Sequence, residues 1–166
     1  HGVPDPNQPD AAGGRNYFFV SHDADATGRR LASTAVPYSE IVRLVTNAPG
    51  RRMVFLDTCY AGLVADPDIN GFVNAWGSKG VYVAAATSGS ALAFEDESWS
   101  HGAMTAALLK AFDGRAERVT PPGEAGITTE LLKPYLREEI RRLTNGCQDP
   151  QILDLNLDRF AFATVD

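Results

Sequence analysis

The chain has 166 residues, of which 44% are hydrophobic and 22% are charged, so it is long enough for one globular domain with a substantial core. Its formal net charge is −6 and it carries no basic run, which argues against a surface that binds nucleic acid or anionic membranes. No apolar stretch approaches the roughly 20 residues that span a bilayer, and no secretory leader is recognisable. Two cysteines, Cys59 and Cys147, are too few for a disulfide scaffold, so we expect a reducing compartment, with the cytoplasm as the default.

The first part of the chain predicts two short strands and one helix. The aromatic run at 17–20 is typical of a strand. Pro37 opens a predicted helix, which the turn residues at 47–50 end. The apolar stripe of this helix consists of Ile41, Val42, Leu44 and Val45. The apolar run at 53–56 then indicates a strand that is buried on both faces.

The second part predicts two further helices among strands. Residues 81–87 form another strand of the buried type. A helix beginning near Ser100 places apolar residues at helical spacing. These residues are Met104, Ala107, Leu108 and Ala111.

A last helix, 130–143, is capped by Thr128 or Thr129, and short strand candidates follow at 152–155 and 160–162. Strands that alternate with helices predict an α/β fold with a mainly parallel sheet and helices on both faces. The chain has neither repeats nor an internal linker that would divide it into two domains.

The strand at 53–56 ends in residues that carry chemistry. Asp57, Thr58 and Cys59 follow it directly, and Gly62 then permits a sharp turn. Ligands bind at the carboxyl ends of strands in open parallel sheets. Free cysteines are also among the most buried residues, so the strand alone leaves two interpretations of Cys59 open, a structural thiol and a nucleophile.

A nucleophilic cysteine needs a neighbour that favours the thiolate and later protonates the leaving group. Three histidines are available, and they are His1, His22 and His101. Spacing does not choose among them, because such a partner is adjacent in space and not in sequence. Cys147 lies in a predicted loop with no activating group beside it.

One apparent metal motif is rejected. Residues 66–71, Asp-Pro-Asp-Ile-Asn-Gly, copy the first half of an EF-hand calcium loop. The twelfth position of such a loop is a bidentate glutamate, and here it is Gly77. The sequence therefore predicts no EF-hand.

Residues 57–62, Asp-Thr-Cys-Tyr-Ala-Gly, resemble the Asp-x-Cys-x-x-Gly nucleophile motif of the caspase and metacaspase superfamily. Other stretches resemble the same family in the expected order. His1-Gly2 resembles its catalytic His-Gly, 17–25 its hairpin strand and Asp-Ala-Asp segment, 86–96 its substrate-lining segment, and 101–109 the helix after it. The resemblance covers nearly the whole chain.

The family places further strands and helices before its His-Gly, and this sequence has none there. The resemblance therefore implies that residues 1–166 are the C-terminal part of a single caspase-like peptidase domain. Its N-terminal strands are absent from this chain, so we expect an open sheet edge.

The resemblance implies a role for each candidate residue. Cys59 is the expected nucleophile and His1 the general acid/base, while the amide groups of Gly2 and Cys59 form the oxyanion hole. Asp57 and Glu95 are expected to bind the side chain before the scissile bond, so cleavage after arginine or lysine is predicted, with arginine preferred. The plainer interpretation is that Asp57 only satisfies backbone N–H groups and that Glu95 is a solvated loop residue.

The expected function is thus that of a cysteine endopeptidase with a Cys–His dyad, which acts on a peptide or protein and needs no cofactor or metal. Calcium activation is left open, with no pattern that places a site. One rival is a catalytically silent interaction or scaffold domain, and another is a hydrolase of a non-peptide acyl group. Besides the substrate, the expected partners are the missing N-terminal part of the domain or a fused sensor domain, and neither nucleic acid nor a membrane.

Overall fold

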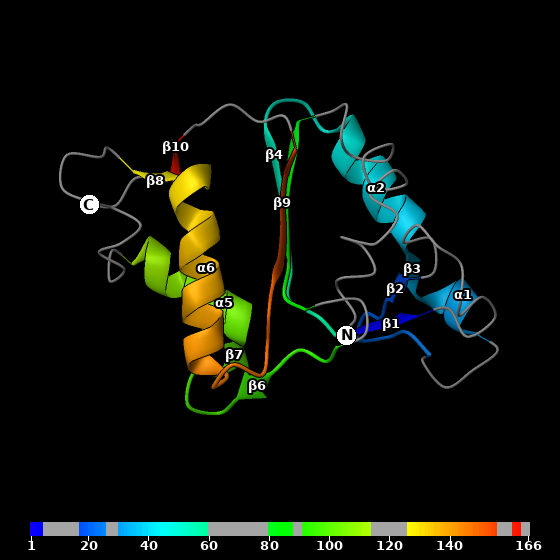
Figure 1. Ribbon diagram of the computed structural model, residues 1–166. Coiled ribbons are helices and arrows are strands. Elements are labelled where there is room, and N and C mark those ends of the chain that lie inside the picture. The colour runs from blue at the N-terminus through cyan, green and yellow to red at the C-terminus, as the bar shows by residue number, and fades with distance from the viewer. Residues whose placement is uncertain are drawn as a thin grey trace.

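A three-stranded sheet with helices on both sides forms the centre of the protein (Figure 1). The computed structural model describes residues 1–4, 17–25, 30–59, 80–87, 91–113, 126–155 and 161–163. The sheet has the order β4-β5-β9, with β4 at Arg52–Leu56, β5 at Val81–Ala85 and β9 at Gln151–Leu155. β5 pairs parallel with β4 and antiparallel with β9. The predicted α/β class is confirmed, whereas the parallel arrangement holds for the β4–β5 pair and the described sheet is small and mixed.

The antiparallel direction of β9 follows from the helix before it. Helix α6 (Thr129–Leu143) ends at the end of the sheet where β5 also ends (Figure 1). The chain therefore enters β9 from that end and runs back along β5, with Gln151 opposite Ala85 and Leu155 opposite Val81. The sequence pattern predicts the strand at 152–155 but does not predict that it runs antiparallel to β5.

Strand β5 is removed from solvent on both faces, and each of its residues is 0% exposed. Side chains alternate along a strand, so two sets of residues point into two different cores. One set, which includes the residue after the strand, is Tyr82, Ala84 and Ala86, and the other is Val81, Val83 and Ala85. The expectation of a buried strand at 81–87 is confirmed.

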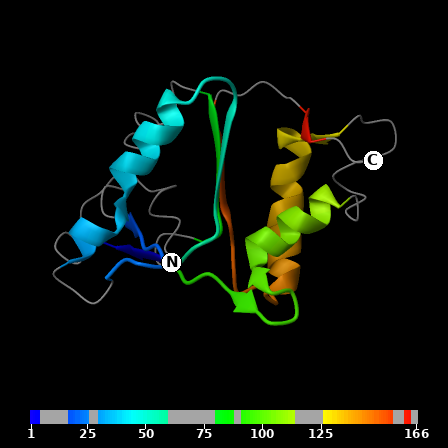
Figure 2. The ribbon, with the colours of Figure 1, turned by 180° about the vertical axis from the view of Figure 1, so that it is seen from behind.

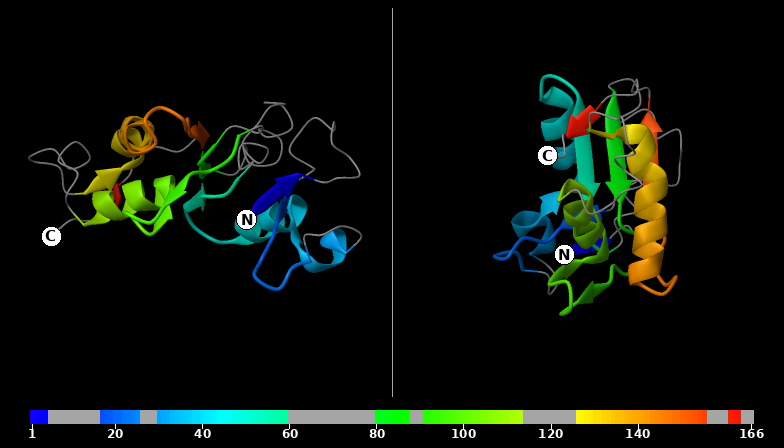
Figure 3. Two further views of the ribbon diagram at one scale, coloured as in Figure 1. Left: turned by 90° about the horizontal axis from the view of Figure 1, so that it is seen from below. Right: turned by 90° about the vertical axis from the view of Figure 1, so that its left-hand side faces the viewer.

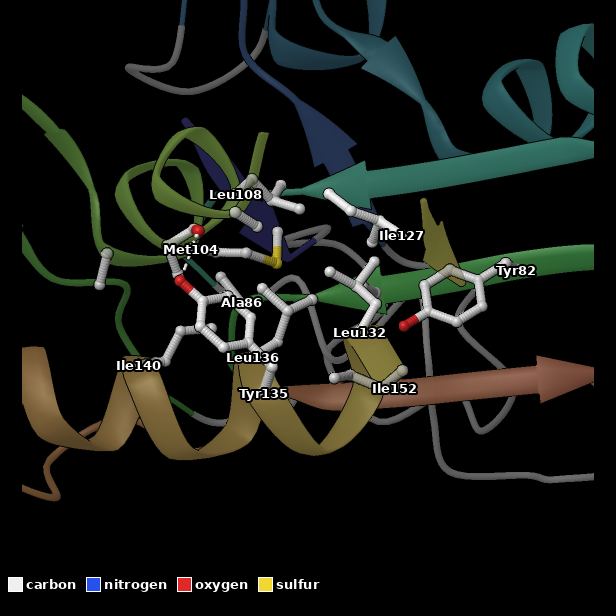
Figure 4. Close-up of a cluster of buried hydrophobic side chains, with 14 residues drawn as sticks. Tyr82, Ala86, Met104, Leu108, Ile127, Leu132, Tyr135, Leu136, Ile140 and Ile152 are labelled. Atoms are coloured by element: carbon white, nitrogen blue, oxygen red, sulfur yellow. Dashed lines mark hydrogen bonds between the residues drawn. The ribbon is translucent and has the colours of Figure 1, made fainter. Parts of the chain in front are cut away.

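The first core lies between the sheet, α5 (Ala103–Phe112) and α6 (Figure 4). Met104 and Leu108 come from α5, and Leu132, Leu136 and Ile140 come from α6. Each such side chain contributes roughly 1.5–3 kcal/mol on burial. The right-hand view of Figure 3 shows α6 running along the strands. The predicted apolar face of α5 is confirmed.

The second core lies between the other face of the sheet and α2 (Tyr38–Asn47). Tyr38 is buried there, and Ile41, Val42 and Val45 pack against the same cluster. Leu44, which the sequence places in this stripe, is 55% exposed. At 100° per residue it lies about 60° outside the arc that Tyr38, Ile41, Val42 and Val45 share, so its inclusion in the stripe was wrong.

Strand β4 is less buried than the sequence predicts. Val54 is buried, while Met53, Phe55 and Leu56 are half-buried. Within the described residues β4 pairs with β5 alone, so its other edge has no described neighbour. The edge position explains why a continuous apolar run is only partly covered.

Small elements complete the described chain. Strands β1 (Gly2–Pro4), β2 (Tyr17–Phe19) and β3 (Val36–Pro37) form an antiparallel sheet, which lies with the short helix α1 (Leu31–Thr34) on the α2 side of the molecule (Figure 2). The two remaining strand pairs are β6 (Glu95–Asp96) with β7 (His101–Gly102), and β8 (Ile127–Thr128) with β10 (Ala161–Ala163). The sequence predicted β2 and approximately β10 but none of the other short elements. No helix among the described residues is long and apolar enough to cross a membrane.

A buried carboxylate joins α5 to α6. Glu139 is 7% exposed and accepts hydrogen bonds from Lys110 Nζ at 3.1 Å and from Arg142 Nε at 3.0 Å. A second bond from Arg142 makes that contact bidentate. The Arg142 hydrogen bonds lower the pKa of Glu139, and Lys110 adds to this effect, although burial acts in the opposite direction.

We predict that Glu139→Gln lowers the free energy of unfolding at pH 7 by about 1–2 kcal/mol, since both cations are partly hydrated and the loss is modest. The folded-state pKa lies below the reference value of 4.5, so this contribution is present above pH 4.5 and disappears as the pH falls through the folded-state pKa. Urea denaturation of parent and variant in steps down to pH 3.5 measures the difference. A difference that stays constant over this range would contradict the prediction.

Candidate functional site

Cys59 lies three residues beyond β4, at the end of the sheet where the parallel strands β4 and β5 both end. It is half-buried and in no disulfide, and its Sγ accepts a hydrogen bond from the Ala93 N–H at 3.4 Å. Cys147, the other free thiol, is exposed. The nucleophile candidate therefore lies in the turn after a sheet strand and accepts a hydrogen bond from a main-chain N–H, whereas Cys147 is exposed.

Strand β1 brings the start of the chain against Cys59, and in Figure 1 the N-terminus lies beside the end of β4. A Cβ atom on Gly2 would collide with the carbonyl oxygen of Cys59 and with the ring of Tyr17. The backbones of Gly2 and Cys59, the two predicted oxyanion-hole residues, are thus in direct contact. Such an approach is open only to glycine.

His1 precedes this contact. Its main-chain nitrogen donates to Val20 O at 3.2 Å, and its carbonyl oxygen accepts from Val20 N–H at 2.8 Å. Its side chain is exposed. The structure thereby anchors the His1 backbone next to the Gly2–Cys59 junction, while the pairing of its imidazole with the thiol stays a prediction.

A buried tyrosine supports the same junction. The Tyr17 hydroxyl lies 2.6 Å from Thr58 Oγ1, and the residue is 1% exposed. Burial raises the pKa of Tyr17, so the phenol stays neutral at physiological pH, and either hydroxyl group can be the donor in its bond with Thr58. Sequence reasoning missed this role, because the pattern at 17–20 indicates only a strand.

Asp57 lies against the start of α5. Its Oδ2 accepts the Thr105 N–H at 2.8 Å, in the first turn of α5, where the helix favours negative charge. A Cβ on Gly102 would collide with this carboxylate. The other oxygen, Oδ1, is buried and has no hydrogen-bond partner within the described structure. Asp57 therefore fulfils the plain structural role with one oxygen, while the second one is enclosed without a partner in the described structure.

An acidic hollow lies beside Asp57. The pair of β6 and β7 places Glu95 opposite Gly102, so Asp57 and Glu95 both adjoin Gly102. The hollow has a volume of ≈ 380 Å³. Its lining residues are Glu95, Asp96, Glu97, Ser100, His101 and Gly102. Three carboxylates in one concave surface attract a cationic ligand.

Glu95 is exposed, as are its two acidic neighbours. Hydrogen bonds from Ser98 hold the pKa of Asp96 below its usual value. Sequence reasoning identified Glu95 but missed Asp96 and Glu97, although the unbroken acidic run at 95–97 was a visible signal.

The other two histidines lie elsewhere. His22 is fully exposed, with Nδ1 3.6 Å from Asp23 Oδ1. His101 lies in β7 and lines the hollow. Neither makes a hydrogen bond to Cys59 in the described structure.

No group of three or more His, Cys, Asp or Glu side chains among the described residues is arranged to hold a metal ion. The rejected calcium motif at 66–71 lies outside the described residues. Comparison of the chain with models of known families, with curated proteins and with solved structures gave no match.

We predict that Gly2→Ala separates β1 from Cys59, because the added methyl group has no room. It should lower the free energy of unfolding by about 1–3 kcal/mol and raise the alkylation rate of Cys59 by iodoacetamide several-fold. Measured in a Cys147→Ser background, the rate reports Cys59 alone.

Gly50→Ala is the matched control. Gly50 has φ of +82° and nothing within 4 Å of an added Cβ, so alanine is strained there but is free of contacts. This variant should lose stability and keep the parent alkylation rate. Equal alkylation rates in parent and Gly2→Ala would contradict the predicted packing.

Proposed function

We propose that this chain is a caspase-like cysteine endopeptidase domain in which Cys59 is the nucleophile and His1 is the general acid/base. The observation that carries the proposal is the contact of Gly2 with Cys59 at the end of two parallel strands. It brings a His-Gly segment against the backbone of Cys59 although the two lie far apart in the sequence. The ordered motifs of the sequence support the same assignment.

In the proposed reaction the Cys59 thiolate attacks the scissile carbonyl carbon, and the carbonyl electrons move onto oxygen. The amides of Gly2 and Cys59 stabilise this oxyanion by several kcal/mol. The C–N bond breaks as His1 transfers a proton to the leaving amine, and the acyl group remains as a thioester. Water activated by His1 then hydrolyses the thioester and restores the thiol. These steps need no cofactor.

For the residue before the scissile bond we propose arginine, and lysine less well. The hollow beside Gly102 supports this preference through its acidic lining, and Asp57 Oδ1 supports it as a buried acceptor without a partner. A guanidinium donates several directed hydrogen bonds, whereas an ammonium acts as a point charge.

A second candidate, a catalytically silent interaction domain, is favoured by one observation. The His1 side chain is exposed, and the hydrogen bonds of His1 in the described structure run through its backbone. In that case the same contacts would serve only to hold β1 on the sheet. We also propose a cytoplasmic location, because both thiols are free.

A panel of short peptide amides tests the dyad. Cys59→Ala should reduce turnover by about 10³-fold or more, and His1→Asn should reduce kcat by about 10²–10⁴-fold. Cys147→Ala should behave as the parent, because its thiol is exposed. Equal losses from both cysteine variants would refute the assignment of Cys59.

The same panel separates the classes of function. Turnover of simple thioesters and esters without any peptide would indicate a hydrolase of non-peptide acyl groups. A chain that alkylates readily at Cys59 but turns over neither class would indicate the silent domain.

Peptides that differ only in the residue before the scissile bond test specificity. The parent should prefer arginine, then lysine, and Asp57→Asn and Glu95→Gln should each reduce the arginine preference by about tenfold, the size of one lost charge-assisted hydrogen bond. Asp149→Asn removes an exposed carboxylate that pairs with Arg141, and so controls for net charge. A parent that prefers aspartate or phenylalanine, or variants with an undiminished arginine preference, would exclude the acidic pocket.

A further inference from the structure

Gln148 is a polar side chain enclosed within the protein. It follows α6 and is 1% exposed. Its Nε2 donates to the carbonyl oxygen of Ala86 at 2.9 Å, and its Oε1 accepts the Phe94 N–H at 2.8 Å. One side chain thus satisfies the end of β5 and the segment before β6, which lie 62 and 54 positions away in the sequence.

The backbone of Gln148 is itself fixed. Its N–H donates to Thr144 Oγ1 at 3.1 Å, and the Thr144 hydroxyl donates to Ile140 O at 2.8 Å. Thr144 and Ile140 are both buried. The amide therefore has little freedom to move and can act as a rigid clip between α6, the sheet and the segment at 91–95.

Both segments that the Gln148 amide binds are hydrogen-bonded in turn to residues at or near Cys59. On the sheet side, Ala86 N–H donates to Leu56 O at 2.8 Å, two residues before Thr58. On the segment side, Ala93 N–H, next to the clipped Phe94, donates to Cys59 Sγ at 3.4 Å. These hydrogen bonds, joined through Ala86 and through the Ala93–Phe94 peptide, connect β4 through Gln148 to the Cys59 sulfur.

We propose that Gln148 is a positioning residue that sets the distance of the segment at 91–95 from Cys59, and with it the placement of the bound peptide. The inference rests on the proposed function. The Gln148 amide holds Phe94 in place. Phe94 lies between Ala93, which donates to the Cys59 sulfur, and Glu95, which lines the hollow, so one side chain sets the position of both neighbours. Gln148 touches neither the thiol nor the hollow.

The side chain has to donate and accept at the same time. Gln148→Met keeps the volume but leaves the Ala86 carbonyl and the Phe94 N–H without their partner. Gln148→Glu keeps the acceptor, and it regains the donor only when its carboxyl group is protonated. The hydrogen-bond partners of Gln148 in the described structure are Ala86, Phe94 and Thr144, none of which titrates.

The experiment measures kcat and KM on the best peptide amide for the parent, both Gln148 variants and Glu139→Gln, which is the control for lost stability away from the site. Gln148→Met should lower kcat/KM by about 10–100-fold, the size of effect expected from an ångström-scale displacement, with the change visible in kcat. Glu139→Gln should keep parent values below its melting temperature. For Gln148→Glu, the ratio of its activity to that of the parent should rise as the pH falls from 8 to 5.5, while the ratio for Gln148→Met stays flat.

Parent-like kcat in Gln148→Met, or a ratio for Gln148→Glu that does not change with pH, would overturn the proposal. If the parent cleaves no peptide, the proposed function fails separately, and the alkylation rate of Cys59 in the Cys147→Ser background becomes the readout. An unchanged rate in Gln148→Met would then overturn the positioning role. If neither variant folds, hydrogen exchange of the parent decides, because the proposal requires a strongly protected Phe94 amide and fast exchange there would overturn it.

Discussion

The burial of both faces of β5 is the constraint on which the rest of the architecture depends. None of its five residues is exposed, so helices have to cover both sides of a small sheet at once. α2 covers the side that carries the valines, and α5 and α6 cover the side of Tyr82, where the small residues Ala84 and Ala86 allow close packing. This arrangement brings the residues after β4, the segment at 91–95, the start of α5 and the end of α6 to one end of the sheet. The candidate site is assembled from the first three of these segments and from the start of the chain, whose Gly2 packs against Cys59.

Main-chain groups determine the geometry at this end of the sheet. Gly2 and Gly102 are in contact with Cys59 and Asp57 because neither has a side chain, and Ala93 and Thr105 contribute their amide hydrogens. Amides held in strands and helices need no rotamer to be frozen, so they fix distances at low entropic cost. Gly2 and Gly102 therefore tolerate no added side-chain atom, because a Cβ at either position would collide with Cys59 or Asp57.

The sequence predicted those parts of the fold that hydrophobic burial decides. A continuous apolar run located β5, and apolar residues at helical spacing located α2 and α5. The capping residues located α6. Strands of two residues, such as β6 and β7, have no period to detect. The residues of the proposed nucleophile motif were found because Asp57 and Cys59 follow a strand directly. Tyr17 and Gln148 were missed because their hydrogen bonds span 41 or more positions, and such contacts leave no local pattern.

The two oxygens of Asp57 allow the structural and the binding interpretation to be weighed against each other. A carboxylate that only caps α5 is satisfied by the bond from Thr105 and by the positive end of the helix, and it could leave its second oxygen in water. Here Oδ1 is buried without a partner in the described structure, which costs roughly 1–3 kcal/mol. Under the proposed binding role, a cationic substrate side chain that reached this oxygen would remove that cost. Oδ2 is already engaged, and Asp57 and Glu95 both adjoin Gly102. In the proposed specificity pocket a guanidinium, with several directed donors, would therefore suit these two carboxylates better than the single ammonium of lysine.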